Sequence, residues 1–213
     1  FGCAYYPWVQ CLDDDTNKVV YLPPSVVALG VMSFTDSVDG PWFAPAGFNR
    51  GGLSTGITGI PVLNATLRLS SKDRDNLYEN RINPIAYFPS EGVVVFGQKT
   101  LQVTKSALDR INVRRMLIYV KRRISFIATA LLFEPNVQDT WDRFLAAANP
   151  MLTDVQQQFG IQEYKLVLDT TTTTPDLIDQ NIMYAKLFIK PTRAIEFIAV
   201  DFFITNTGAS FED

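Results

Sequence analysis

The chain has 213 residues, of which 47% are hydrophobic and 19% charged, and its formal net charge is −3. This composition provides enough apolar surface for a folded core and excludes wholesale disorder. The small negative charge gives no general attraction to nucleic acid or anionic membranes. The complete absence of histidine removes the most common general base and metal ligand.

Cys3 and Cys11 are the only cysteines, and their spacing matches no zinc or redox motif. Two unpaired thiols and one local disulfide are both compatible with the sequence. No apolar run reaches the roughly 18 residues that a membrane-spanning helix needs, so we expect no stable membrane insertion. The chain begins without Met and without the basic start of a signal peptide, which predicts a fragment of a longer protein.

Residues 1–64 have the composition of a mixed, turn-rich segment. Alternating residues predict strands at 8–12 and 18–22, joined by an aspartate-rich hairpin turn. Two prolines then start a predicted helix over 23–33, where a missing N–H costs nothing. We expect residues 1–64 to be the incomplete C-terminal part of an adjoining domain.

Residues 65–213 are expected to form an α/β domain, in which two antiparallel helices pack on a small mixed β-sheet. A short polar helix is predicted at 71–80, with Ser70 or Ser71 as its N-cap and Asn83-Pro84 at its end. The apolar run within 91–100 predicts a strand that is buried on both faces.

A long helix is predicted at about 106–132. Apolar residues recur along it at steps of three and four, and Ile111, Ile118 and Phe126 lie on roughly the opposite side. A helix that is apolar on two sides is covered on both. We therefore expect its own domain to cover one side and a neighbouring subunit to cover the other.

The same helix carries dense positive charge. Seven basic residues and one acidic residue lie between 105 and 123, which gives this segment a net charge of +6 in an acidic chain. A solvated face, a binding face for an acidic protein partner and a nucleic-acid contact are all open interpretations. The candidate partner-binding residues are Arg110, Arg114, Arg115, Lys121, Arg122 and Arg123.

A second helix is predicted to start after Asn136 as N-cap and to end at Gly160, with a kink at Pro150. Strands are expected at 164–168, 181–190 and 194–205. The polar tail has too little apolar content to fold alone, so it is expected to fray or to act as an arm that orders on a partner.

The sequence shows no catalytic constellation. No Ser or Cys lies in a nucleophile elbow, and a conventional triad is impossible without histidine. Sequence spacing does not test a hydrolase that uses two paired carboxylates, because such a site requires a pocket that brings the two side chains together. We expect no enzymatic activity, no cofactor and no metal.

Several motifs in sequence order resemble the C-terminal domain of contractile tail sheath proteins, most closely those of T-even-type phages. They are Asn83-Pro84-Ile85, the glycine-bounded valine run at 92–97, Ile111-Asn112-Val113-Arg114-Arg115, Phe133-Glu134-Pro135-Asn136, Trp141 and Ala194-Ile195-Glu196-Phe197. Upstream, Tyr6-Pro7-Trp8 and Gly40-Pro41-Trp42 are similar to the preceding sheath domain. The resemblance covers nearly the whole chain.

This resemblance implies a structural subunit that polymerises as stacked hexameric rings around a tail tube and contracts to drive the tube through the host envelope for genome delivery. It implies strand exchange between neighbouring subunits, and contacts with the tube, baseplate and tail terminator proteins. The protein would be part of the virion after assembly in the host cytoplasm. The candidate arm is 204–213, with Ile204 and Phe211 as partner-binding residues.

Two alternative functions remain open. The same motifs fit the sheath of a non-phage contractile injection particle. A nucleic-acid-binding module could instead use the basic helix at 105–123, although no groove-reading motif or aromatic platform accompanies it.

Overall fold

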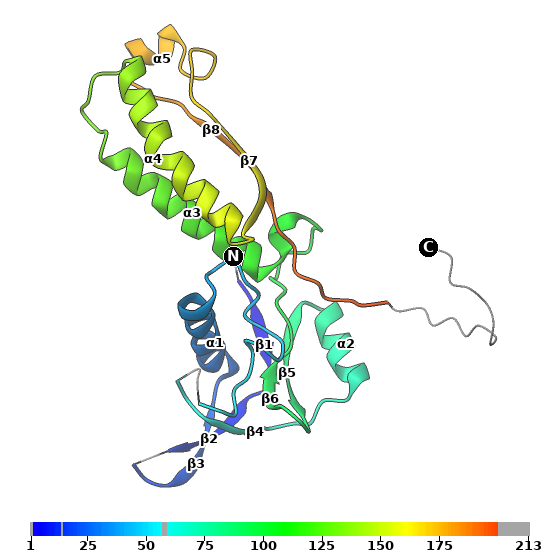
Figure 1. Ribbon diagram of the computed structural model, residues 1–213. Helices are drawn as coiled ribbons and strands as arrows, with labels where there is room; N and C mark the ends of the chain where they lie inside the picture. The colour runs from blue at the N-terminus through cyan, green and yellow to red at the C-terminus, as the bar shows by residue number, and fades with distance from the viewer. Residues whose placement is uncertain (1, 14, 57–58, 200–213) are drawn as a thin grey trace, which may run out of the picture.

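The computed structural model of the chain describes residues 2–13, 15–56 and 59–199. In these residues the molecule is elongated, with two lobes that have separate cores (Figure 1). The lower lobe in Figure 1 contains α1, α2 and β1 to β6, and the upper lobe contains α3 to α5, β7 and β8. The fold is therefore α/β with small sheets, as the sequence predicts.

Two three-stranded sheets form the lower lobe. In the first, β2 (Val9–Asp13) lies between the antiparallel strands β3 (Lys18–Leu22) and β4 (Val62–Ala65). The pairing of β2 with β3 confirms the predicted hairpin. Alternate residues of β2 point into the core, since Val9 and Cys11 are buried whereas Leu12 is exposed.

The second sheet joins the start of the chain to its middle. Here β5 (Ile82–Phe88) pairs in parallel with β1 (Ala4–Tyr6) and antiparallel with β6 (Gly92–Val95). The three valines of β6 are fully buried, as predicted, whereas Phe96, the last residue of the predicted buried run, is 39% exposed. In contrast, Asn83 and Pro84 lie inside β5 and do not end a helix, because the preceding helix stops at Glu79 and Arg81 adopts a positive φ of 63°.

Two helices flank these sheets. Helix α1 (Pro24–Val38) has proline in its first turn as predicted, and it continues beyond the expected end. Helix α2 (Ser71–Glu79) begins with a capping box in which Ser70 and Asp73 each accept from the other's backbone N–H. It contains no fully buried residue, but Leu77 and Tyr78 are half-buried and the Arg74 guanidinium lies over the Phe88 ring.

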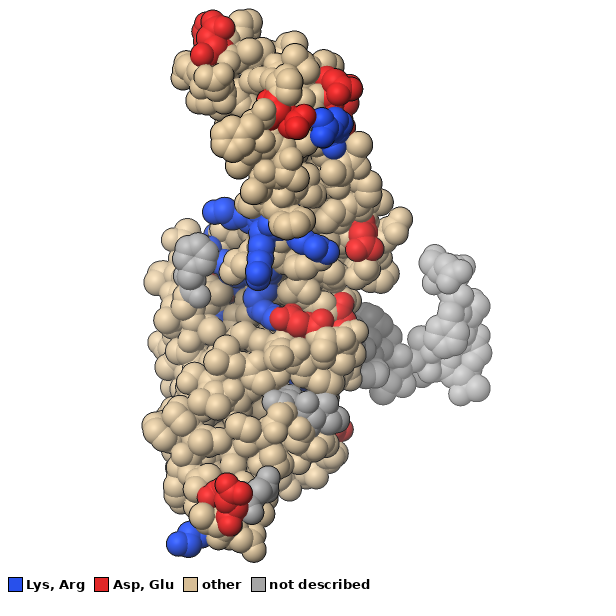
Figure 2. Space-filling view, turned by 90° about the vertical axis from the view of Figure 1, so that its left-hand side faces the viewer, with Lys and Arg blue, Asp and Glu red and all other residues tan. Residues whose placement is uncertain are grey.

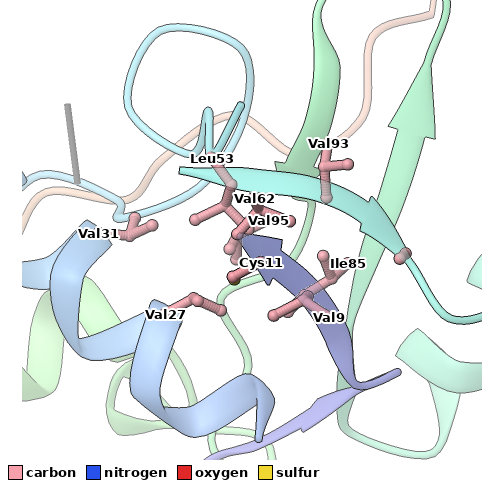
Figure 3. Close-up of a cluster of buried hydrophobic side chains, with 10 residues drawn as sticks. Val9, Cys11, Val27, Val31, Leu53, Val62, Ile85, Val93 and Val95 are labelled. Carbon is pink, nitrogen blue, oxygen red and sulfur yellow. The ribbon is translucent and has the colours of Figure 1, made fainter. Parts of the chain in front are cut away.

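The lower core is built around the side chains of β2, α1 and β6 (Figure 3). Val27 and Val31 of α1 face Val9 and Cys11 of β2 across this core. Residues from 82–95 share the same buried cluster. Thus residues on both sides of position 64 are packed together. The change from one core to the other lies nearer residue 100, except that Trp42 and Phe43 pack into the upper core.

The upper lobe is a helix pair on a two-stranded sheet. Helix α3 (Ile111–Thr129) runs beside α4 (Gln138–Gln157), and α4 leads into β7 (Ile161–Val167) (Figure 1). The short helix α5 (Pro175–Asp179) then connects β7 to its antiparallel partner β8 (Lys186–Pro191). The helix pair confirms the prediction, but its sheet does not include the valine strand, which belongs to the lower lobe.

The predicted apolar stripes of α3 and α4 meet in the upper core. Val113 and Val120 of α3 and Leu152 and Val155 of α4 are at most 2% exposed and form one cluster with Ile161. This interior explains why two amphipathic helices remain paired, since burial of a large aliphatic side chain contributes about 1.5–3 kcal/mol. Pro150 lies within α4, as predicted.

The predicted start of the long helix at Ser106 is wrong. Residues Ala107–Asp109 form a 3₁₀ turn that is capped by the Ser106 hydroxyl, and Arg110 is extended before α3 begins. The backbone of this turn pairs elsewhere, because Thr100 N–H donates to Asp109 and Ile111 N–H donates to Gln98. These long-range hydrogen bonds outweigh local helix propensity.

Two further predictions are wrong. Asn136 does not cap α4, because its side chain accepts from the Trp141 indole N–H at 2.8 Å and donates to the Ile182 carbonyl at 3.2 Å. The expected strand at 194–205 is absent from its described part, 194–199, since no other strand in the described chain lies alongside to supply hydrogen bonds. The remainder of that strand lies outside the described residues.

Candidate functional site

The basic segment that the sequence singles out runs from the junction of the two lobes up α3. Figure 2 shows Lys and Arg side chains gathered at the middle of one face of the molecule, where the lobes meet. The structure divides the six candidate residues into two groups of different character. Arg110, Arg114 and Arg115 contact the chain's own lobes, whereas Lys121, Arg122 and Arg123 are exposed.

Arg110 joins the start of α3 to the segment that follows β8. Its Nε and Nη2 atoms donate to the two carboxylate oxygens of Glu196 at 2.6 and 2.8 Å, and its Nη1 atom lies 3.2 Å from Asp109. Burial disfavours the charged guanidinium, but its hydrogen bonds to the Glu196 carboxylate and the negative charge of Glu196 outweigh that effect and raise the pKa of Arg110. The side chain is thus committed to an internal ion pair.

Arg114 and Arg115 are also engaged within the molecule. Arg114 donates to the Leu108 carbonyl at 2.8 Å and to the Gln102 side chain at 2.5 Å. Arg115 forms an ion pair with Asp36 of α1 and donates to the Met32 carbonyl at 3.2 Å. Arg115 therefore links α3 of the upper lobe to α1 of the lower lobe.

The second group lies on the solvent side of α3. Arg122 stands between Ile118 and Phe126 at helical spacing, and these two apolar side chains are 54% and 75% exposed. The predicted second apolar side of α3 is thus real at these positions, whereas Ile111 is buried within the chain's own fold. An arginine between exposed apolar side chains has the composition of a protein-binding surface.

A hollow of about 690 Å³ lies between the 3₁₀ turn, α2 and the segment after β8. Three carboxylates line it, but Glu196 and Asp109 are both paired with Arg110. Burial and the neighbouring Arg110 charge lower the pKa of Lys99 at the same wall. Burial raises the pKa of Tyr78 next to Glu196. Two of the three carboxylates, Asp109 and Glu196, are thus held in an ion-pair network around Arg110 and are not poised as a free acid and base.

A metal-binding cluster and a membrane-spanning helix are both absent from the part of the chain that the structure describes. Its acidic and cysteine side chains form no cluster that could hold a metal ion. None of its helices has the length and apolarity to cross a membrane. Cys3 and Cys11 are both free thiols, which decides between the two alternatives left by the sequence.

Sequence reasoning missed the residues that hold the basic segment in place. Asp36 and Glu196 lie 79 and 86 residues from their arginine partners, so no local pattern pairs them. The one available signal was a single acid within the apolar run at 194–198. The candidate arm residues Ile204 and Phe211 lie outside the described residues and remain predictions.

Comparison with known proteins identifies the relatives of this chain. The family model "Phage tail sheath C-terminal domain" matches residues 103–205. The tail sheath protein of Vibrio phage KVP40 is 38% identical over 200 residues, and that of Enterobacteria phage T4 is 35% identical over 200 residues. Each alignment covers 94% of this chain but 29% of the relative, so the chain spans less than a third of the length of these proteins.

A solved structure extends the similarity to both lobes. The sheath complex of an extracellular contractile injection system, PVC, in its contracted state superposes with a TM-score of 0.82 at 29% identity. The superposition covers 94% of this chain and 55% of that one. Residues 103–205 therefore match the phage tail sheath C-terminal domain family, and nearly the whole chain is similar to tail sheath proteins such as those of phages KVP40 and T4.

Proposed function

We propose that the protein is a structural subunit of a contractile phage tail sheath. The observation that carries this proposal is the combination of the matched C-terminal sheath domain with an α3 surface that is both basic and apolar. The subunit would polymerise as stacked hexameric rings around the tail tube and contract to drive the tube through the host envelope. Its role would be mechanical and not enzymatic.

The proposed partners follow from this role. Neighbouring subunits would exchange strands through terminal arms, and 204–213 is the proposed donor. The tail tube, baseplate and tail terminator proteins would contact the assembled sheath. The protein would reside in the virion tail after assembly in the host cytoplasm.

The division into an adjoining domain and a polymerising C-terminal domain also stays a proposal. The change of core near residue 100 is the boundary that packing favours.

Deletion of 204–213 tests the polymerisation mechanism. The buried clusters contain no residue beyond Ile189 among those described, so the shortened subunit should stay folded. We expect it to keep its unfolding temperature and to form no sheath, as seen by electron microscopy of full-length protein with the same deletion. Sheaths of normal length from the deleted protein would contradict the proposed arm.

Reversal of the exposed charges tests the proposed docking face. Arg122→Glu with Arg123→Glu should weaken sheath–tube or sheath–sheath association, because both side chains are exposed and flank Phe126. The matched control is Lys18→Glu with Lys72→Glu, which makes the same charge change on exposed residues of the lower lobe. Equal loss of assembled tails in both variants would show that net charge alone matters.

Each of the two alternative functions is tested by its own measurement. A nucleic-acid-binding module predicts DNA or RNA affinity that falls steeply with salt, and fluorescence anisotropy at low salt measures it directly. The absence of binding at low salt would end that hypothesis. A sheath of a non-phage injection particle would form the same polymer without capsids, so particle morphology in a host lysate separates it from a phage tail.

A further inference from the structure

In residues 193–199 an acidic side chain is largely buried while the apolar side chains around it are exposed, which is the reverse of the usual pattern. Between Arg193 and Ala199, every residue is exposed except Glu196. Ile195, Phe197 and Ile198 are 82–83% exposed, whereas the Glu196 side chain is 14% exposed. The buried carboxylate needs a hydrogen-bonding or charged partner within the fold. The exposed apolar side chains favour a second partner on the solvent side.

The partner of Glu196 is present in the same chain. Its two carboxylate oxygens accept from Arg110 at 2.6 and 2.8 Å in a bidentate pair, and one of them also accepts from the Gln98 amide at 3.2 Å. Paired charge-assisted hydrogen bonds of this kind fix orientation as well as position. They join the segment to the start of α3, at the junction of the two lobes.

Other attachments of this segment are few. Thr192 N–H donates to the Gly160 carbonyl at 3.3 Å, and residues 193–199 make no backbone–backbone hydrogen bond to the rest of the described chain. The segment supplies no member of any buried cluster in the described chain. Figure 1 shows it passing from β8 down past the start of α3 towards α2. Its position on the body therefore depends on Glu196.

We propose that the Arg110–Glu196 ion pair is a latch that pins the root of the C-terminal segment and turns Ile195, Phe197 and Ile198 outward for capture by a second copy of the chain. A pinned segment has already lost much of its conformational freedom, so a second subunit that binds it loses less entropy. The assembly part of this inference rests on the proposed sheath function. The latch itself does not.

Double electron–electron resonance (DEER), which measures the distance between two spin labels, tests the latch on the unassembled protein. The labels are placed at Ala199→Cys after the latch and at Asp75→Cys on exposed α2, in a Cys3→Ser background in which Cys11 stays buried. We expect one narrow distance distribution in this parent. Glu196→Gln removes the charge but keeps the side-chain size, and we expect the released fraction to rise about tenfold and broaden the distribution.

Two comparison variants make the test specific. Arg110→Lys keeps the positive charge but loses the planar fork, so it should give an intermediate broadening. Glu134→Gln breaks the exposed ion pair with Arg143 and should leave the narrow distribution unchanged. A narrow distribution in Glu196→Gln would overturn the latch, and so would equal broadening in Glu196→Gln and Glu134→Gln. If Glu196→Gln fails to fold, Arg110→Lys provides the test instead. An unchanged distance distribution in Arg110→Lys would also overturn the latch.

The consequence for assembly is measured separately by light scattering. The critical concentration for polymerisation of the full-length protein should rise several-fold with Glu196→Gln and stay unchanged with Glu134→Gln. An unchanged critical concentration in a variant whose segment is released would overturn the capture role. If the parent itself never polymerises, the proposed sheath function fails while the distance measurement still decides the latch.

Discussion

Charge reversal at two arginines of α3 should separate the internal role of the basic segment from its surface role. Arg115 contacts α1 through Asp36 and the Met32 carbonyl, and its side chain is 15% exposed. Arg122 is exposed and forms no hydrogen bond or ion pair within the described part of the chain. We predict that Arg115→Glu destabilises the fold, whereas Arg122→Glu leaves stability unchanged and impairs assembly.

The magnitude for Arg115 follows from its two contacts. Charged hydrogen bonds each contribute about 1.5–3 kcal/mol when buried. Asp36 is 47% exposed, so solvent screening reduces the ion-pair part, and a loss of about 2 kcal/mol is expected for both contacts together. For a chain of this length, this corresponds to a fall in Tm of roughly 4–8 °C. Exposed Arg122 should change the free energy of unfolding by no more than about 0.5 kcal/mol.

Circular dichroism during heating measures both variants under the same conditions. Lys121→Glu serves as a second exposed control on the same helix. An equal loss of Tm in Arg115→Glu and Arg122→Glu would refute the division of the basic segment into internal and exposed groups. Full thermal stability of Arg115→Glu would show that its contact with α1 does not hold the lobes together.

Three further predictions concern the fold that carries this surface. Leu152→Ala should cost about 2–5 kcal/mol in urea unfolding, because Leu152 is fully buried between the helices; a cost below about 1 kcal/mol would contradict that packing. Gly92→Ala should cost about 1–3 kcal/mol, since its φ is 75° and an added Cβ would collide with Ser54; unchanged stability would show that the turn adjusts. Hydrogen bonds from Ser70 lower the pKa of Asp73, so the stability that ionised Asp73 contributes is present above the unfolded carboxyl pKa and lost as pH falls through the folded pKa. Ser70→Ala should return the Asp73 pKa towards 3.8 in an NMR titration, and an unchanged pKa would refute the capping box.

Local signals explain the elements that the sequence predicted well. An aspartate-rich turn between alternating residues marks the β2–β3 hairpin, and Ser70 with Asp73 marks the start of α2. The apolar stripes at steps of three and four predict the pairing of α3 and α4. Each of these signals lies within a few residues of the structure that it specifies.

The missed features depend on residues that are distant in the chain. Strand β1 pairs in parallel with β5, and the buried Asn83 side chain donates to the Ala4 and Lys99 carbonyls. The same holds for the candidate site, where Asp36 and Glu196 decide which arginines remain exposed. A count of basic residues on α3 could therefore locate the segment, but it could not tell the internal arginines from the surface ones.

Electron microscopy of the full-length protein, incubated with and without its tail tube, tests the central proposal most directly. A sheath subunit should form tubular polymers around the tube, with the surface of Ile118, Arg122 and Phe126 at a protein–protein contact. Particles that remain single subunits in the presence of the tube would contradict the proposed function. A polymer in which this surface faces open solvent would instead contradict the docking role of α3.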